Sequence, residues 1–457
     1  MLTFYNSLTQ QKEVFHPKPS GVIDLYVCGM TVYDYCHIGH GRIFVVYDAL
    51  ARYFRAKKFR VNYVRNITDI DDKIIKRANE NKESYSILTE RFIHAMHEDE
   101  KRLGCESPTQ EPKATEFIEP MIEMIQALLQ KGFAYIGKTG DIYYDVRKFR
   151  AYGKLSHRDI DELRSGARVE VNLDKHDPLD FVLWKLSEAN EPSWSSPWGQ
   201  GRPGWHIECS AMSSTLLKPP FDFHGGGVDL KFPHHENEIA QTEAVCECEV
   251  TRGWMHVGHV QVNAEKMSKS LGNFLTIREA CDAHHPEAVR YFMLSAHYRS
   301  PLTYSEENLR LAEQALARLY TAIRGLVLQE ESSDTYYDLA FDKALSDDFN
   351  TPEALAVLFQ LAKAINVVKE QNEPKKAASL AVKLIRLGQM LGLLVSSPEE
   401  FLQGDQKNVQ AIEALIQARE QARQTKDWKK ADEIRAALTQ WGVVVEDGPK
   451  GSTWRML

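Results

Sequence analysis

The first part of the chain carries two different hydrophobic patterns. Residues 23–27 are mostly apolar and predict a buried strand, after which the segment 29–40 predicts a loop. Between Ile43 and Phe54, apolar residues recur every three or four positions, which is the spacing of one helix face. Residues 60–67 alternate between apolar and polar positions and predict a second strand. Strand, helix and strand in this order predict a βαβ unit, and therefore a doubly wound parallel sheet.

The rest of the chain changes pattern several times. Residues 116–203 interrupt the two halves of this α/β fold and predict an inserted subdomain. The composition of residues 191–204 predicts a loop at the end of this insertion. Beyond Ser305, apolar residues at helical spacing predict a series of helices to about residue 394. Polar stretches at 329–335 and 396–406 predict linkers, and the last fifty residues predict a charged helix followed by a short strand at 443–445.

We therefore expect three domains. An α/β domain would occupy residues 1–305, with the insertion at 116–203 and a signature-loop region at 263–305. A helical bundle would occupy residues 306–396, and a small carboxyl-terminal domain residues 397–457.

Composition narrows the class of protein. The net charge of -8 argues against a chain coated in nucleic acid, but it allows one locally basic groove. No apolar run approaches the roughly 20 residues of a membrane span, and the first residues lack the pattern of a secretory signal. Seven cysteines in 457 residues form no disulfide framework, and their odd number fits a reducing compartment. We expect a cytoplasmic protein without membrane association.

The motif HIGH at residues 37–40 follows the first strand and opens the helix. In an open parallel sheet, ligands bind beyond the carboxyl ends of the strands, and a helix amino terminus favours phosphate. His37 and His40 can donate hydrogen bonds to the α-phosphate of ATP, and Gly39 allows the nucleotide to approach closely. The alternative for the two histidines is a pair of helix caps.

A second motif, KMSKS at residues 266–270, follows another strand as a polar loop. Lys266 and Lys269 are suited to the charge of a departing pyrophosphate, for which one positioned donor is typically worth about 3–4 kcal/mol. A solvated lysine loop is the alternative. Either motif alone is weak, but the two together, in this order and setting, favour ATP binding.

Four side chains in three segments suggest a metal site. Cys28 ends the first strand, Cys209 lies in WHIECSA, and His234 and Glu238 lie in PHHENEI. Four residues apart on a helix, His234 and Glu238 would share a face. Two thiolates, an imidazole and a carboxylate can bind Zn²⁺ tetrahedrally. Scattered core residues are the alternative.

These segments resemble the cysteinyl-tRNA synthetase family of class I aminoacyl-tRNA synthetases. The resemblance rests on TVYDYCHIGH, GWHIECS, HGGGVDLKFPHHENE and KMSKS, and it continues to EDGPKGSTWR near the end of the chain. It implies a Rossmann-like catalytic domain, a helical bundle and an anticodon-binding domain. It also implies one Zn²⁺ per chain on Cys28, Cys209, His234 and Glu238, with ATP and Mg²⁺ as further requirements.

The implied reaction activates L-cysteine with ATP to cysteinyl-adenylate and transfers the aminoacyl group to the 3′-terminal ribose of tRNA(Cys). A zinc site that admits the substrate sulfur would bind cysteine as a thiolate, because a free thiol has a pKa of about 8.5 and zinc lowers it. Serine cannot supply an equivalent ligand at neutral pH. Such an enzyme needs no editing domain, and the insertion is short.

The resemblance also implies substrate contacts at Thr68, Trp205 and Asp229. Asp229 can pair with either the cysteine ammonium or the ribose hydroxyls, and Trp205 can instead be a packed loop residue. Histidines at 206, 224, 235 and 256 can support the metal ligands from behind. Cys246 and Cys248 suggest a second metal site, but a structural role is favoured.

Near the end of the chain, residues 419–435 place basic side chains and Trp428 on a predicted helix. Cations that follow phosphates and a ring that stacks on a base suit single-stranded RNA. A solvated amphipathic helix is the alternative. The resemblance implies that the anticodon is contacted by Arg423, Trp428, Asp432 and Asp447.

Two other functions compete with this one. A ligase that passes the cysteinyl-adenylate to a small amine would share the catalytic half, but it would need no anticodon-reading domain. A zinc-stabilised RNA-binding protein without catalysis would not need both ATP motifs. We favour the tRNA ligase, and we expect it to act as a monomer.

Overall fold

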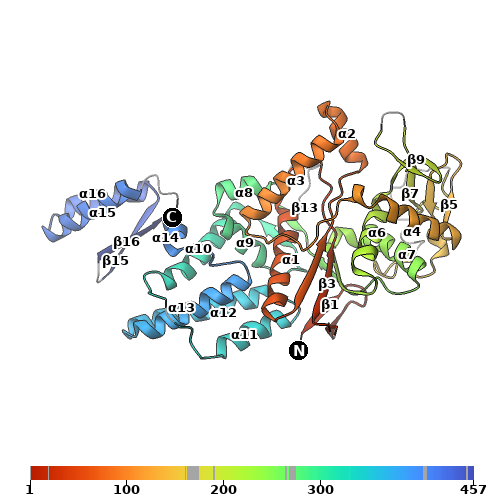
Figure 1. Ribbon diagram of the computed structural model, residues 1–457. Helices are drawn as coiled ribbons and strands as arrows, with labels where there is room; N and C mark the ends of the chain where they lie inside the picture. Colours follow the sequence, from red (N-terminus) through yellow and green to blue (C-terminus); the bar gives the residue numbers. More distant parts are fainter. Residues whose placement is uncertain are drawn as a thin grey trace. The chain divides into compact units, whose positions relative to one another are not determined.

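The computed structural model describes residues 2–18, 20–159, 161, 174–188, 191–262, 265–266, 274–328, 330–404, 409–448 and 451–456. The chain forms two compact units (Figure 1). The first unit comprises Met1–Leu309 and Ala340–Ala354, and the second comprises Arg310–Leu339 and Leu355–Leu457.

A four-stranded parallel sheet lies at the centre of the first unit. Its strands are β3 (Val22–Val27), β4 (Arg60–Arg65), β10 (Phe221–Gly227) and β11 (Thr251–Val257), in the order β11-β10-β3-β4. The chain moves outward from β3 to β4 on one side and from β10 to β11 on the other. The strand order therefore reverses between β3 and β10, which is where ligands bind in such folds.

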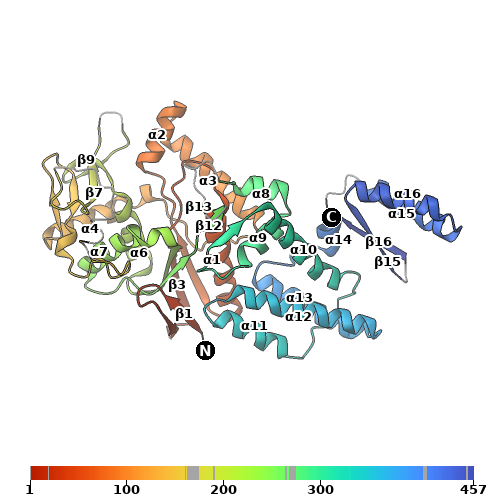
Figure 2. The same ribbon diagram turned by 180° about the vertical axis from the view of Figure 1, so that it is seen from behind.

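Helices cover both faces of this sheet. Helix α1 (Ile38–Ala56) lies on one face, and helices α6 (Trp205–Leu217) and α7 (His234–Cys246) lie on the other (Figures 1 and 2). Strand β3 is accordingly buried from both sides, since Leu25 and Val27 point to one face, Tyr26 points to the other, and all three are fully inaccessible. The predicted doubly wound parallel sheet is confirmed.

A separate antiparallel sheet is inserted in the chain between β4 and β10. Its strands are β5 (Ala134–Ile136), β6 (Ile142–Tyr144), β7 (Phe181–Leu186), β8 (Trp194–Ser196) and β9 (Gly199–Pro203), in the order β5-β6-β7-β9-β8. The loop predicted at 191–204 is wrong, because β8 and β9 pair there as a hairpin. Of the glycines and prolines that suggested a loop, Pro197 lies in the turn, and Gly199, Gly201 and Pro203 lie in β9, which pairs with both β7 and β8.

Smaller elements complete the first unit. Strands β1 (Thr3–Asn6) and β2 (Gln11–Val14) form a hairpin, and β12 (Val260–Val262) pairs with both β13 (Glu265–Lys266) and β14 (Leu302–Tyr304). The remaining elements are α2 (Asp72–Asn81), α3 (Tyr85–Arg102), α4 (Ile118–Gln130), α8 (Ile277–Ala283), α9 (Pro286–Leu294) and the short 3₁₀ turns η1 (Ala114–Glu116), η2 (Val146–Lys148) and η3 (Val228–Lys231).

The series of helices predicted beyond Ser305 is present. It consists of α10 (Glu306–Ile323), α11 (Tyr336–Ser346), α12 (Thr351–Glu370) and α13 (Pro374–Met390). The linker predicted at 396–406 is wrong in part, because α14 (Pro398–Gln403) forms within it. A reciprocal capping box between Ser397 and Glu400 stabilises its first turn.

The carboxyl-terminal segment differs from the single helix predicted at 419–435. It forms two helices, α15 (Val409–Gln424) and α16 (Trp428–Gln440), and the chain breaks between them at Lys426, whose φ is 60°. Asp427 then caps α16, and its side chain accepts a hydrogen bond from the Lys430 amide. The short strand predicted at 443–445 is longer, since β15 (Val443–Gly448) pairs with β16 (Gly451–Met456).

One of the described helices, α12, is long and apolar enough to cross a membrane by length and composition alone. Half of its most apolar 18-residue window is buried inside the protein, as in the core helix of a soluble domain. This helix is therefore weak evidence for a membrane span.

Candidate active site

A cavity of about 490 Å³ lies where the strand order reverses in the first unit. The residues that follow β3, the start of α1 and the residues that follow β10 form its wall. Among its lining residues are Cys28, Gly29, His37, Gly39, His40, Lys73, Trp205, Gly227 and Asp229. The structure thus brings together motifs that lie almost 200 residues apart in the sequence.

His37 and His40 cap the amino terminus of α1. The Nδ1 atom of His37 accepts a hydrogen bond from the Gly39 amide at 3.1 Å, and the Nδ1 atom of His40 accepts one from the His37 amide at 3.2 Å. The two rings stack with their centroids 3.8 Å apart. Both rings also line the cavity, so the capping role and the expected phosphate role occupy the same side chains.

The second ATP motif is only partly described. Lys266 ends strand β13, and its side chain, like Met267, Ser268, Lys269 and Ser270, lies outside the described residues. The expected roles of Lys266 and Lys269 stay predictions.

Helix α1 is fixed to the sheet below the cavity. The Tyr47 hydroxyl donates to the Met255 carbonyl and accepts from the Gly226 amide, both at 2.8 Å. A side chain at Gly225 would place its Cβ 2.3 Å from that hydroxyl oxygen, so only glycine fits there. The buried Arg42 guanidinium donates to the Gly258 carbonyl at 2.9 Å.

The four predicted metal ligands converge at the base of this region. Cys28, Cys209, His234 and Glu238 are at most 5% exposed, and one donor atom from each lies within 4.8 Å of the others. Glu238 Oε1 is 3.2 Å from the Cys28 sulfur and 3.1 Å from His234 Nε2. Ligands of a tetrahedral zinc ion are separated by about 3.3–3.8 Å. The donor set therefore fits a Zn²⁺ ion, and the separations of 3.1 and 3.2 Å need to widen only slightly to reach tetrahedral spacing.

The pKa of each residue in this cluster depends on the charges and hydrogen bonds of its neighbours. Burial and the neighbouring Cys209 hold the pKa of Cys28 well above its usual value. Burial would also raise the pKa of Cys209, but the hydrogen bond from Cys28 and the charge of His234 lower it to about 6. The pKa of Glu238 falls well below its usual value despite burial, because His224 and His234 stabilise the carboxylate. The cluster thus favours the anionic forms of Cys209 and Glu238 and the neutral thiol of Cys28, whose proton a bound metal cation would displace.

Other buried histidines support the cluster. His224 Nε2 lies 3.5 Å from the Cys28 sulfur, and with His235 it forms a second donor set that shares Cys28 and Glu238. His235 Nδ1 lies 2.8 Å from His256 Nε2, a contact that orients the His235 ring.

His206 packs against the cluster from another side. Its Nδ1 atom lies 3.0 Å from Nδ1 of His234. Burial lowers the pKa of His206 well below its usual value, which favours the neutral ring.

The three predicted substrate contacts have different surroundings. Trp205 lines the cavity, and its ring centroid lies 4.4 Å from that of His234. Asp229 is exposed in η3 and also lines the cavity. Thr68 is 2% exposed and is not among the lining residues, and its hydroxyl donates to Glu208 at 2.9 Å. The structure therefore brings two of the three to the cavity wall.

Several residues near the site escaped the sequence analysis. Lys73, in the first turn of α2, lines the cavity, and its ammonium lies 5.8 Å from the ring centroid of Tyr33. Asn66, the first residue after β4, contacts both Gly29 and Cys209. Its place at the carboxyl end of a strand of the parallel sheet is the one sequence feature that could have indicated it.

Cys246 and Cys248 form a disulfide at the end of α7. Paired sulfurs leave no thiolate for a metal, so the structure does not support the second metal site that the sequence suggested.

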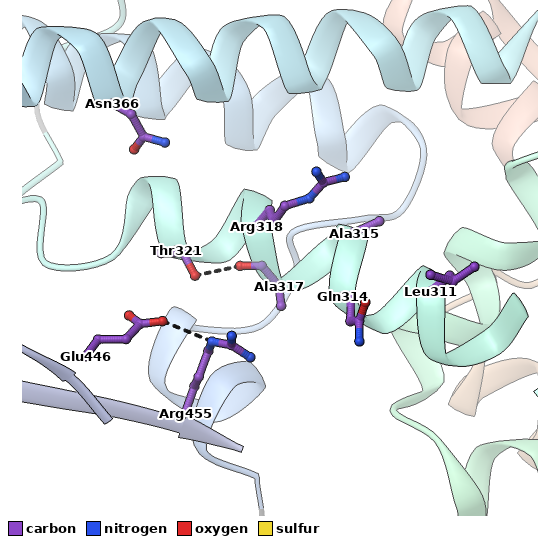
Figure 3. Close-up of a pocket in the computed structure, with 9 residues that line it drawn as sticks. All are labelled: Leu311, Gln314, Ala315, Ala317, Arg318, Thr321, Asn366, Glu446 and Arg455. Atoms are coloured by element: carbon purple, nitrogen blue, oxygen red, sulfur yellow. Dashed lines mark hydrogen bonds and ion pairs between the residues drawn. The ribbon is translucent and has the colours of Figure 1, made fainter. Parts of the chain in front are cut away.

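A larger cavity, of about 680 Å³, belongs to the second unit (Figure 3). Helices α10 and α12 and the β15–β16 hairpin supply its lining, which includes Arg318, Asn366, Glu446 and Arg455. Arg455 pairs with Glu446 across the hairpin at 3.0 Å. Its described lining contains neither thiol nor imidazole, so the smaller cavity of the first unit remains the candidate for cysteine chemistry.

The predicted anticodon contacts form two pairs. Arg423 and Asp447 form an ion pair at 2.7 Å, and Arg419 holds the same carboxylate through two bonds of 2.7 and 2.9 Å. Trp428, which is 59% exposed, and Asp432 lie four residues apart on α16 and share one face.

Comparison with known proteins agrees with this arrangement. Residues 14–314 match the family profile described as the class I (C) catalytic domain of tRNA synthetases. Residues 340–395 match a DALR domain, and residues 407–455 match a cysteinyl-tRNA ligase anticodon binding domain. A cysteine--tRNA ligase of Coxiella burnetii (strain Dugway 5J108-111) is 57% identical over 99% of this chain and 100% of the relative. The chain belongs to the cysteine--tRNA ligase family.

Further relatives extend the comparison beyond one genus. The cysteine--tRNA ligase of Pseudomonas aeruginosa (strain UCBPP-PA14) is 55% identical over the full length of both chains. Among solved structures, a Mycobacterium tuberculosis methionyl-tRNA synthetase in complex with methionyl-adenylate is similar with a TM-score of 0.58. It is 16% identical and covers 83% of this chain and 95% of its own, which supports the fold alone.

Proposed function

We propose that the cavity and the buried cluster of the first unit form the site at which this chain activates cysteine for transfer to tRNA(Cys). The observation that carries the proposal is the convergence of Cys28, Cys209, His234 and Glu238 beside a cavity lined by His37 and His40. A thiol-binding centre next to a phosphate-binding helix end is what the condensation of cysteine with ATP requires.

Cys28, Cys209, His234 and Glu238 would hold one Zn²⁺ per chain. A bound Zn²⁺ lowers the pKa of a thiol that contacts it, which selects cysteine over serine. The chain's own residues then orient the rest of the amino acid: Trp205 walls the pocket, and Asp229 accepts from the cysteine ammonium or the ribose hydroxyls.

The ATP end of the site has a different task. The cysteine carboxylate attacks the α-phosphorus, and the bond from that phosphorus to pyrophosphate breaks. His37 and His40 stabilise the charge that develops on the α-phosphate, and Gly39 leaves room for the nucleotide. Lys266 and Lys269 neutralise the leaving pyrophosphate together with Mg²⁺, and one such donor is commonly worth about 3–4 kcal/mol.

Transfer to RNA completes the reaction. A hydroxyl of the 3′-terminal ribose attacks the carbonyl of cysteinyl-adenylate, and AMP leaves. Arg423, Trp428, Asp432 and Asp447 would contact the anticodon, which distinguishes this function from a ligase for a small amine. A domain that matches an anticodon-binding family supports this choice.

The same proposal includes the organisation of the chain. Residues 1–305 form the catalytic domain, with its insertion at 116–203 and the signature-loop region at 263–305, and residues 306–396 and 397–457 form the bundle and the anticodon-binding domain. The three matching family profiles, over residues 14–314, 340–395 and 407–455, follow one another in the same order as these domains. We further propose a cytoplasmic monomer without membrane association.

Two assays on the purified chain test the function. Cysteine-dependent exchange of pyrophosphate into ATP reports adenylate formation, and aminoacylation of tRNA(Cys) reports transfer. Exchange with cysteine but no charging of tRNA(Cys) would favour the small-amine ligase. Charging without dependence on cysteine, or the absence of both activities in the zinc-loaded protein, would refute the proposal.

A further inference from the structure

Asn66 joins the two chain segments that supply sulfur to the buried cluster. It follows β4 directly and is 1% exposed. Its side-chain oxygen accepts from the Gly29 amide at 2.9 Å and lies 3.6 Å from the Cys209 sulfur. Because Gly29 follows Cys28 in the sequence, one side-chain amide contacts the chain at both cysteines.

The other end of this amide is also engaged. Asn66 Nδ2 donates to the Thr68 hydroxyl oxygen at 3.3 Å, and that hydroxyl donates to Glu208 at 2.9 Å. Glu208 immediately precedes Cys209 in α6. The sulfur contact and these two hydrogen bonds therefore form a closed path from Cys209 through Asn66 and Thr68 back to helix α6.

The orientation of the amide follows from its partners. The Gly29 amide can only donate, so the Asn66 side chain must present its oxygen there and its NH₂ group to Thr68. The hydroxyl proton of Thr68 is then left for the Glu208 carboxyl group. Only a side chain with an acceptor on one edge and a donor on the other satisfies both neighbours.

The backbone fits as closely as the side chain. A Cβ atom at Gly29 would lie 1.7 Å from the carbonyl oxygen of Asn66. The segments that follow β3 and β4 are thus in direct backbone contact beside the cluster. Asn66 contributes both its backbone carbonyl and its side chain to this contact with Gly29.

We propose that Asn66 is a positioning residue of the metal centre, which holds the Cys28–Gly29 segment and Cys209 at a separation that lets both sulfurs bind one ion. The inference rests on the proposed function in one respect, that the cluster binds Zn²⁺. Groups that orient metal ligands from behind typically change metal affinity or activity by about 10–100-fold. Asn66 is not among the residues that line the ATP cavity, so its effect should fall on the metal and on cysteine.

The test compares Asn66→Ala with the wild type and with Asn62→Ala. Asn62 is a matched control, because it lies in β4, the strand that Asn66 follows, and its amide donates to Asp24 within β3, away from the cluster. Zn²⁺ affinity is measured by competition with a chromophoric chelator, and the ligand field by the absorption spectrum of the Co²⁺-substituted protein. For Asn66→Ala we expect about 10–100-fold weaker Zn²⁺ binding, an altered Co²⁺ spectrum, a similar rise in KM for cysteine and an unchanged KM for ATP.

Thr68 provides a second, gentler variant. Thr68→Val keeps the shape but removes the bond that orients the amide, so Zn²⁺ affinity should fall in the same direction by a smaller factor. Thr68→Ser should restore it. A rise in KM for cysteine with unchanged Zn²⁺ affinity in Thr68→Val would instead make Thr68 a direct substrate contact and overturn the network.

Wild-type Zn²⁺ affinity and an unchanged Co²⁺ spectrum in folded Asn66→Ala would overturn the positioning role. If Asn66→Ala does not fold, unchanged Zn²⁺ affinity in Thr68→Val overturns it equally. Failure of the proposed function would give a different result. The wild-type chain itself would then bind no Zn²⁺ or show no cysteine-dependent pyrophosphate exchange.

Discussion

The region proposed to bind cysteine and the region proposed to bind the anticodon differ in their exposure to solvent. In the first unit, Cys28, Cys209, His234 and Glu238 are at most 5% exposed, and their partners are other buried polar groups. In the second unit, the side chains of Arg423 and Asp447 are each 40% exposed and pair with one another. A buried cluster loses function when any member is removed, because no solvent is present to compensate the charges that lose their partner. An exposed ion pair can exchange its partner for RNA at little cost.

The largest effect should come from breaking the buried cluster. Cys209→Ser removes one of the four proposed zinc ligands, so Zn²⁺ and cysteine affinity should be lost together. Metal content and cysteine binding are measured on the same preparation. Cys281→Ser is the control, because Cys281 is a free buried thiol in α8 outside the described clusters. Full zinc retention with unchanged cysteine binding would show that the cluster does not recognise the substrate.

The next largest effect concerns the pyrophosphate end of the same site. Lys269→Ala should lower the rate of adenylate formation by about 10²–10³-fold, because it removes one positioned donor to the leaving group. Lys269→Arg keeps the charge and should lose less. Pyrophosphate exchange at the wild-type rate in folded Lys269→Ala would contradict the assigned role.

An exposed aromatic residue should have a smaller effect, limited to RNA. Trp428→Ala should lower kcat/KM for tRNA by about 10–100-fold, since stacking on a base is worth about 1–3 kcal/mol. Adenylate formation without tRNA should not change. Trp441 lies at the other end of α16 and is 50% exposed, so Trp441→Ala is the matched control. Equal loss of both half-reactions in Trp428→Ala would indicate a general loss of structure.

The smallest effect should be the stability contributed by the ion pair between Asp447, whose side chain is 40% exposed, and Arg419, whose side chain is 7% exposed. The hydrogen bond from Arg419 holds the pKa of Asp447 well below its usual value. A carboxyl with a lower pKa in the folded state stabilises it above the unfolded pKa of about 4, and this contribution is lost as the pH falls. A double-mutant cycle with Arg419→Met and Asp447→Asn should give a coupling of about 1 kcal/mol or less at pH 7, which declines only at strongly acidic pH, where Asp447 becomes protonated in the folded state. A coupling of several kcal/mol would show that this pair behaves like a buried ion pair.

The sequence predicted the parts of the fold that depend on local periodicity. The βαβ unit, the helices beyond Ser305 and the shared face of His234 and Glu238 follow from spacing alone. The break at Lys426 was missed because the basic residues continue on both sides of it, and the hairpin β8–β9 was missed because glycine and proline also favour loops. The contacts of Asn66 could not be predicted, since they depend on tertiary structure: Gly29 lies 37 residues away in the sequence and Cys209 lies 143 residues away.

The attachment of helix α1 has a consequence for motion during the catalytic cycle. A helix whose Tyr47 hydroxyl bonds to two strands, and whose Arg42 bonds to a backbone carbonyl, cannot slide or rotate without breaking buried hydrogen bonds. Any opening of the cavity that admits substrates and releases products must then come from movement of the loops around it, and not from movement of helix α1. Amide hydrogens in the middle of α1 should exchange only when the whole unit unfolds, whereas those of the surrounding loops should exchange through local opening.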